Sequence, residues 1–63
     1  MENKYVIFGD LKLNERYWVV NGHWEFKVTA ILENKVKIYI YGTSRHHWYT
    51  EAQFNYDFKV IKY

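Results

Sequence analysis

The chain has 63 residues, of which fourteen are aromatic (three Trp, seven Tyr and four Phe), and none is Pro or Cys. A chain this short forms one domain, residues 1–63, and its core is too small to support a deep catalytic cavity as well. Nine Lys and Arg against seven Asp and Glu give a net charge of +2, which excludes an acidic mimic of nucleic acid and lies below the basic excess of an obligate nucleic-acid binder. Because there is no Cys for a disulfide and no apolar segment long enough for a membrane span, we expect a soluble, cytoplasmic protein without membrane contact.

The N-terminal third predicts a short strand at residues 4–8, closed by Gly9-Asp10, and a longer strand at residues 16–20. Asn21-Gly22 follows, and this pair predicts a tight hairpin because a type I′ turn needs positive φ at both central residues. The hairpin leads into a second long strand. The expected cross-strand pairs are Arg16 with Lys27, Tyr17 with Phe26, Trp18 with Glu25, and Val19 with Trp24.

Residues 24–32 alternate between apolar side chains at even positions and mostly polar ones at odd positions, which predicts an amphipathic strand. Residues 35–41 alternate in the same way. We expect a three-residue loop with a bulge at residues 33–35, because a two-residue loop would place Lys37 opposite Ala30 on the apolar face. The pairs that follow are Leu32 with Val36, Ala30 with Ile38, Val28 with Ile40, Thr29 with Tyr39, and Lys27 with Tyr41.

The C-terminal third predicts a fourth main strand at residues 45–49, one helical turn and a closing strand at residues 58–61. Thr50 with Gln53 three residues later forms the capping-box pattern that starts a helix. Asn55 and Asp57 favour turns and limit this helix to one or two turns. The expected interior consists of Tyr17, Trp24, Phe26, Val28, Ile38, Ile40, Phe54 and Phe58.

These elements predict an all-β fold, a small antiparallel barrel of five to six strands with one short helical turn before the last strand, because a barrel hides strand edges. The segments that carry a family resemblance are residues 17–20, 26–32, 36–41 and 48–54. Over residues 14–62 the chain resembles the small SH3-like barrels of bacterial and phage proteins. The tight hairpin at Asn21-Gly22 replaces the long acidic loop of the peptide-binding SH3 domains, so the resemblance does not imply binding of proline-rich peptides. The abundance of Lys, Asn, Ile and Tyr is similar to that of small accessory proteins of phages and mobile elements.

The expected register places aromatic and basic side chains together on the outward face of the sheet. The candidate binding residues on this face are Arg16, Trp18, Lys27, Lys37, Tyr39 and Tyr41. Aromatic and cationic side chains bind single-stranded nucleic acids on sheets, and Trp, Tyr and Arg also dominate protein–protein hot spots. The ordinary alternative is that these aromatics only stabilise the sheet, or that the N-terminal segment covers part of them.

The string Arg45-His46-His47-Trp48-Tyr49 is the most unusual in the chain. Adjacent histidines in a strand point to opposite faces, so the pair cannot chelate one ion, and we expect no metal site. A histidine beside a binding surface titrates near neutral pH and can make that surface pH-sensitive, although one solvated and one structural histidine is the plainer interpretation. We add Arg45, His47 and Tyr49 to the candidate partner-binding residues.

Nothing in the chain forms a catalytic motif. There is no Cys nucleophile and no Gly-rich phosphate loop, and the hydroxyls of Thr43, Ser44 and Thr50 have no third group that would orient a histidine beside them. We therefore expect no catalytic residue and no cofactor. The leading hypothesis is a non-enzymatic binding module, encoded by a phage or mobile element, that binds and modulates a host protein. The alternatives are a nucleic-acid binder that uses the same face and a homodimer formed through an exposed edge strand.

Overall fold

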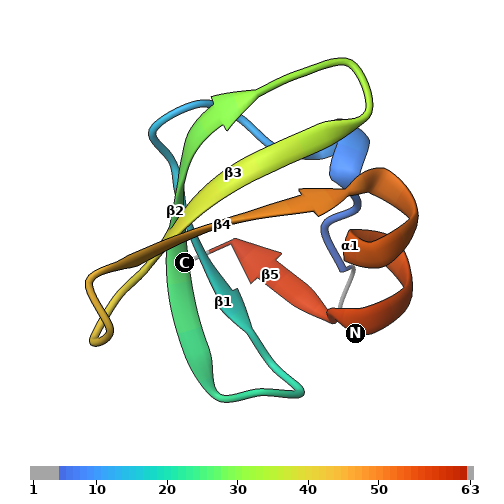
Figure 1. Cartoon of the computed structure of the whole chain (residues 1–63). Coiled ribbons are helices and arrows are strands. Elements are labelled where there is room, and N and C mark those ends of the chain that lie inside the picture. The colour runs from blue at the N-terminus through green and yellow to red at the C-terminus, as the bar shows by residue number, and fades with distance from the viewer. Residues whose placement is uncertain (1–4, 63) are drawn as a thin grey trace.

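The computed structural model describes residues 5–62, which form one open five-stranded antiparallel sheet with the strand order β4-β3-β2-β1-β5. The strands are β1 (Arg16–Val19), β2 (Trp24–Ile31), β3 (Lys35–Ile40), β4 (Arg45–Thr50) and β5 (Val60–Lys62), and the helices are the 3-10 turn η1 (Phe8–Asp10) and α1 (Glu51–Asp57). The sheet is strongly curved, and both η1 and α1 lie on its inner side (Figure 1). The expected β-rich fold with a short helix before the last strand is confirmed.

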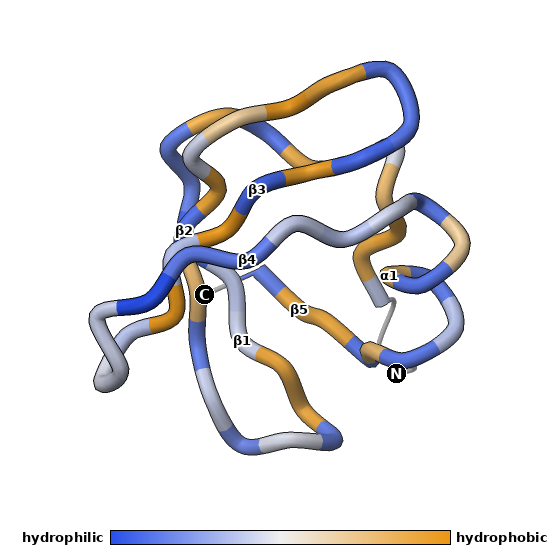
Figure 2. The backbone as a smooth tube through the Cα atoms, viewed as in Figure 1, coloured by the Kyte–Doolittle hydropathy of each residue, from blue (hydrophilic) through white to orange (hydrophobic). Residues whose placement is uncertain are grey.

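The core lies between the curved sheet and the two short helices. Hydrophobic and hydrophilic residues alternate along β3, so one side of the strand faces the core (Figure 2). The buried side chains are Phe8, Leu11, Tyr17, Val19, Phe26, Val28, Val36, Ile38, Phe54 and Val60. Phe54 of α1 packs edge-on against both Phe8 and Phe26, with ring centroids 6.4 Å and 6.1 Å apart. These aromatic contacts attach α1 and η1 to the sheet, as the surplus of aromatics without disulfides predicts.

The hairpin between β1 and β2 has the expected register but a different turn. All four expected pairs are present, from Arg16 opposite Lys27 to Val19 opposite Trp24. The loop covers residues 20–23, however, and the left-handed residue is His23, with φ 58°. The physical reason lies in the Asn21 side chain, which binds the segment before β5: its Nδ2 donates to the Asp57 carbonyl (2.9 Å) and its Oδ1 accepts from the Lys59 N–H (3.0 Å). The prediction of a type I′ turn at Asn21-Gly22 is therefore wrong.

The expected register between β2 and β3 is also wrong. The Leu32 N–H donates to the Lys35 carbonyl (2.8 Å), which leaves a two-residue loop, and Lys37 does lie opposite Ala30. A bulge between Val28 and Ala30 then brings the apolar residues of β2 and β3 back onto the same face of the sheet. The pairs beyond the bulge are Val28 with Ile38, Lys27 with Tyr39, and Phe26 with Ile40.

The bulge also changes which face residues 30–32 occupy. Ile31 lies opposite the buried Val36, whereas Ala30 shares a face with Lys37. The extra residue is Thr29, whose Oγ1 donates to the Lys37 carbonyl (3.1 Å). The expectation that Ala30 and Leu32 face the core is therefore wrong, and Ile31 is the residue of this segment that shares a face with Val36.

The chain ends differ in detail from the expected elements. The strand at residues 4–8, of which residue 4 lies outside the described residues, is reduced to a single bridge between Val6 and Val60, and Phe8 begins η1. The capping box of Thr50 and Gln53 is confirmed, and α1 reaches seven residues. The closing strand begins at Val60 because Phe58 serves as the C-cap of α1.

Candidate functional site

A row of aromatic and cationic side chains crosses four neighbouring strands on the outward side of the sheet. Arg16 lies opposite Lys27, Lys27 opposite Tyr39, and Tyr39 opposite His46. Directly opposed residues in antiparallel strands point to the same face. We call this surface the outer face. Its residues are Arg16, Trp18, Glu25, Lys27, Lys37, Tyr39, Tyr41, His46 and Trp48.

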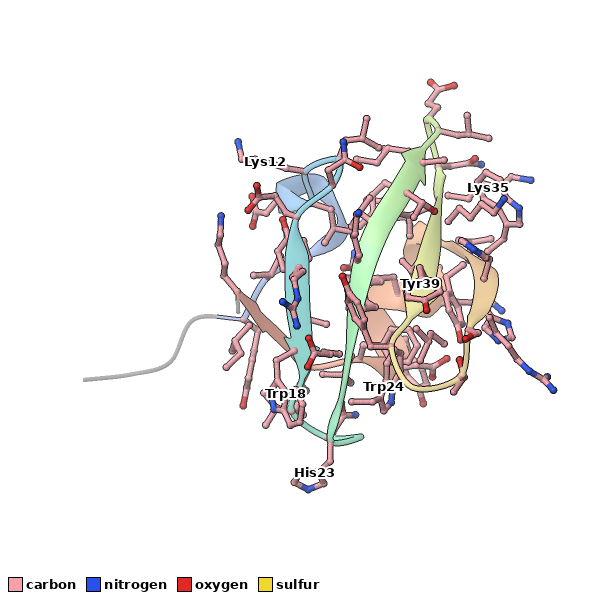
Figure 3. All side chains as sticks on the ribbon, turned by 90° about the vertical axis from the view of Figure 1, so that its left-hand side faces the viewer. Lys12, Trp18, His23, Trp24, Lys35 and Tyr39 are labelled. Atoms are coloured by element: carbon pink, nitrogen blue, oxygen red, sulfur yellow. The ribbon has the colours of Figure 1, made fainter. Side chains whose placement is uncertain are left out.

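Figure 3 looks onto the outer face, with Trp18 and Tyr39 on the side toward the viewer. Neither η1 nor α1 covers this side of the sheet. Trp18, Lys27, Lys37, Tyr39 and Tyr41 are half-buried, while Arg16, His46 and Trp48 are exposed. The six residues expected on the outward face are thus brought together, although the pairs across β2 and β3 are shifted by two residues.

Arg16 is held at one side of the outer face by two contacts. Its guanidinium forms an ion pair with the Glu25 carboxylate of the neighbouring strand. Its Cζ lies 4.8 Å from the centroid of the Tyr41 ring, which is a cation–π distance. The planar guanidinium is therefore oriented by an acid and an aromatic ring rather than free to rotate.

The aromatic rings at the centre of the outer face contact one another, Tyr39 and Tyr41 edge to face and Tyr39 and His46 at a tilted angle. The Tyr39 and Tyr41 centroids are 5.2 Å apart with an interplanar angle of 88°, and Tyr39 lies 5.2 Å from the His46 ring. In the next cross-strand pair on this face, Lys37 and Trp48, the Lys37 Nζ lies 5.9 Å from the Trp48 ring centroid. These contacts restrict the rotamers of large side chains before any partner arrives, which reduces the entropy that binding would cost.

Two of the expected site residues lie on the other side of the sheet. His47 is opposite Ile38 and Tyr49 is opposite Val36, and both of these β3 residues face the core. Arg45 lies opposite Ile40, at the end of β4. The pair of histidines does point to opposite faces, as expected. The partner-binding residues named from the sequence therefore divide between two surfaces.

Sequence reasoning missed His46, Trp48 and Glu25 as members of the outer face. The first two are assigned by the loop of residues 41–44, which pairs Ile40 with Arg45 and so places the even residues of β4 beside Tyr39 and Lys37. The turn signal at Gly42, whose φ is 91°, marks this loop but does not by itself give the register. The place of Glu25 on the outer face follows from the expected register, which sets it opposite Trp18 and diagonal to Arg16 across the first hairpin.

The Tyr49 side chain continues an aromatic cluster that lies beside β4 on the inner side. The centroid of its ring is 5.0 Å from that of Phe58, and Phe58 is 5.3 Å from Trp24. Burial raises the pKa of the Tyr49 hydroxyl above its ordinary value, and the negative charge of Asp57 adds to this effect. The hydroxyl is therefore neutral at physiological pH.

Within residues 5–62 the structure encloses no pocket, and no three His, Asp or Glu side chains gather where they could hold a metal ion. No helix in this part of the chain is long and apolar enough to cross a membrane. The chain matches none of the known protein families, curated proteins or solved structures with which it was compared.

Proposed function

We propose that this chain is a non-enzymatic binding module that recognises another protein through its outer face. The observation that carries the proposal is the row from Arg16 through Lys27 and Tyr39 to His46, which spans four strands on the uncovered side of the sheet. Trp, Tyr and Arg are the residue types that contribute most to protein–protein hot spots. Among residues 5–62, five such residues lie on the outer face, namely Arg16, Trp18, Tyr39, Tyr41 and Trp48.

The ring geometry favours a protein over a nucleic acid. Bases stack on exposed aromatic ring faces. Here Arg16 lies over the Tyr41 ring, Lys37 lies toward the Trp48 ring, and Tyr39 meets Tyr41 edge to face. These contacts leave a rigid surface of ring edges and amphipathic side chains. A folded or extended protein segment fits such a surface better than stacked bases do.

A nucleic-acid partner is the second candidate, and the positions of Lys27 and Lys37 beside aromatic rings favour it. Binding through phosphates would weaken steeply with salt because condensed counterions are released. Titration of fluorescent single-stranded and duplex DNA and RNA at about 50 mM and about 200 mM salt separates the candidates. Absence of binding at the lower concentration excludes nucleic acid, whereas tight, salt-sensitive binding contradicts the protein assignment.

We also propose that the open sheet belongs to an SH3-like barrel and that the chain acts in the cytoplasm as an accessory protein of a phage or mobile element. The curvature of the sheet, the position of α1 before β5 and the resemblance over residues 14–62 support this fold. The lack of Cys and the composition support the location and the source. An experimental structure in which the two ends of the sheet remain unpaired and far apart would contradict the barrel.

The direct test is affinity capture from a lysate of the native host, followed by mass spectrometry, with and without nuclease. We expect one enriched protein whose capture is insensitive to nuclease. Loss of all enriched protein after nuclease treatment would assign the binding to nucleic acid.

A further inference from the structure

Strand β4 has one paired edge and one free edge. Within residues 5–62 it pairs only with β3, and the Glu51 N–H donates to the Asn34 carbonyl (2.9 Å) in line with that ladder. Hydrogen-bonded pairs alternate with non-bonded pairs in an antiparallel ladder, so the odd residues of β4 bond to β3. The backbone N–H and C=O groups of His46 and Trp48 therefore point away from the sheet.

No hydrogen bond within residues 5–62 reaches these backbone groups of His46 and Trp48. The next edge amide, that of Thr50, is already satisfied by the Gln53 Oε1 at 3.1 Å. The free edge is thus two residues of unpaired backbone at the middle of a six-residue strand. Natural edge strands are blocked by Pro, by charged side chains such as Lys, or by bulges, and β4 has none of these between His46 and Tyr49, its charged residue being Arg45 at the first position.

The side chains beside the free edge are aromatic and basic on both sides of the sheet. On the inner side lie Tyr49 and Phe58, both half-buried with ring centroids 5.0 Å apart, and the exposed His47, whose ring centroid is 6.2 Å from that of Tyr49. On the outer side, Trp48 is 47% exposed and the Lys37 ammonium extends toward its ring. Arg45, at the start of the strand, adds a second cation on the inner side. A strand added to this edge would therefore meet an aromatic side chain and a cation on each face.

We propose that the β4 edge binds an extended segment of a protein partner as an added strand, and that this segment carries both acidic and apolar residues. Strand addition takes its affinity from main-chain hydrogen bonds and its specificity from alternate side chains. Apolar side chains of the segment lie beside Tyr49 or Trp48, and acidic ones lie beside Lys37 or Arg45. The inference rests on the proposed function only in requiring a protein partner, because it uses the β4 backbone and, of the outer face, only the residues beside β4 (Lys37, His46 and Trp48).

The probe is a synthetic peptide of alternating glutamate and valine, blocked at both ends, titrated into the ¹⁵N-labelled chain. We expect chemical-shift changes centred on β4 and slower amide exchange at His46 and Trp48. A peptide with lysine in place of glutamate should bind about tenfold or more weakly. The glutamate–valine peptide methylated at alternate backbone nitrogens should not bind. Equal binding of the two charge types, or unchanged exchange at both amides, overturns the proposal.

Two variants separate the backbone from the side chain. His46→Pro removes the outward N–H and leaves the ladder with β3 intact, as edge strands permit, whereas His46→Ala keeps that N–H. We expect His46→Pro to weaken peptide binding about tenfold, and His46→Ala to weaken it much less. Equal losses in the two variants overturn the proposal. If His46→Pro does not fold, the methylated peptide tests the same hydrogen bonds on the unaltered chain.

Trp18→Ala, on β1, distinguishes this inference from the proposed function. It should leave peptide binding unchanged, and loss of peptide binding in a folded Trp18→Ala chain would place the peptide on the outer face and overturn the inference. Failure of lysate capture overturns the proposed function and leaves the peptide titration unaffected. Sedimentation without peptide identifies the competing occupant: a dimer with slow exchange at His46 and Trp48 would mean that a second copy covers the edge, which also overturns the proposal.

Discussion

The indole of Trp24 lies directly against Gly22, so that a Cβ at position 22 would stand 2.3 Å from the Trp24 Nε1. Gly22 is therefore required by this close approach and not by a left-handed backbone. The contact directs the Trp24 ring toward Phe58, at a centroid distance of 5.3 Å, and so positions the aromatic cluster beside β4.

Gly22→Ala should destabilise the chain by about 1–3 kcal/mol, because the Trp24 indole must move away from Phe58. The measurement is urea unfolding followed by tryptophan fluorescence and circular dichroism. Gly9→Ala is the matched control, since a Cβ at Gly9 would meet nothing within 4 Å. A loss equal to that of the control would show that the Trp24 contact has no energetic role.

Thr50→Ala should cost about 1 kcal/mol of unfolding free energy by removing the capping box of α1. In the structure the Thr50 Oγ1 accepts from the Gln53 N–H at 3.2 Å. Loss of this bond loosens the helix that carries the fully buried Phe54. Thr50→Ser keeps the hydroxyl and should retain most of the stability, and urea unfolding of both variants checks the difference. Equal destabilisation by Ala and Ser would assign the effect to the methyl group instead.

Stability should fall as the pH rises above the ordinary Tyr49 pKa of 10.0, because the folded state raises that pKa by burial. The sign follows from proton linkage: the folded chain holds the Tyr49 proton more tightly than the unfolded chain, so its contribution is complete below the unfolded pKa and is lost toward the folded one. Tyr49→Phe removes this ionisation.

The check is thermal unfolding of wild type and Tyr49→Phe between about pH 8 and about pH 11. We expect the wild-type melting temperature to fall more steeply at the alkaline end. Tyr56→Phe, at a tyrosine that is 89% exposed, serves as the control and should follow wild type. Parallel curves for wild type and Tyr49→Phe would contradict the burial of this hydroxyl.

The period-two alternation of apolar residues predicts most of the sheet, because each strand buries one face and an apolar residue at every second position marks that face. Val36, Ile38 and Phe26 are fully buried, and the first hairpin has its expected register. The bulge at Thr29 was not predictable from its neighbours. At that point the Val28 N–H donates to the Glu15 carbonyl (3.1 Å), and its carbonyl accepts from the Asn14 N–H (2.8 Å). These partners come from a loop distant in the sequence, and no local pattern indicates them.

The candidate site was predictable where the sequence showed which face a residue occupies, and the two-residue shift between β2 and β3 leaves Lys37, Tyr39 and Tyr41 on the expected face. Arg16, Trp18 and Lys27 lie in the first hairpin, and their shared face follows from its correct pairing. His46 and Trp48 depend on the loop of residues 41–44, because a change of one residue in its length exchanges the two faces of β4. The expected opposite orientation of His46 and His47 is confirmed, but the sequence did not show which of the two lies on the outer face.

The central claim is that the outer face binds a protein, and it is tested most directly by the affinity of the captured partner for Tyr39→Ala and Trp18→Ala. Tyr56→Ala is the matched control, since this tyrosine is 89% exposed on α1. With all variants folded by circular dichroism, the account predicts that each outer-face variant binds about tenfold or more weakly and that Tyr56→Ala binds as wild type does. Unchanged affinity in both outer-face variants would contradict it.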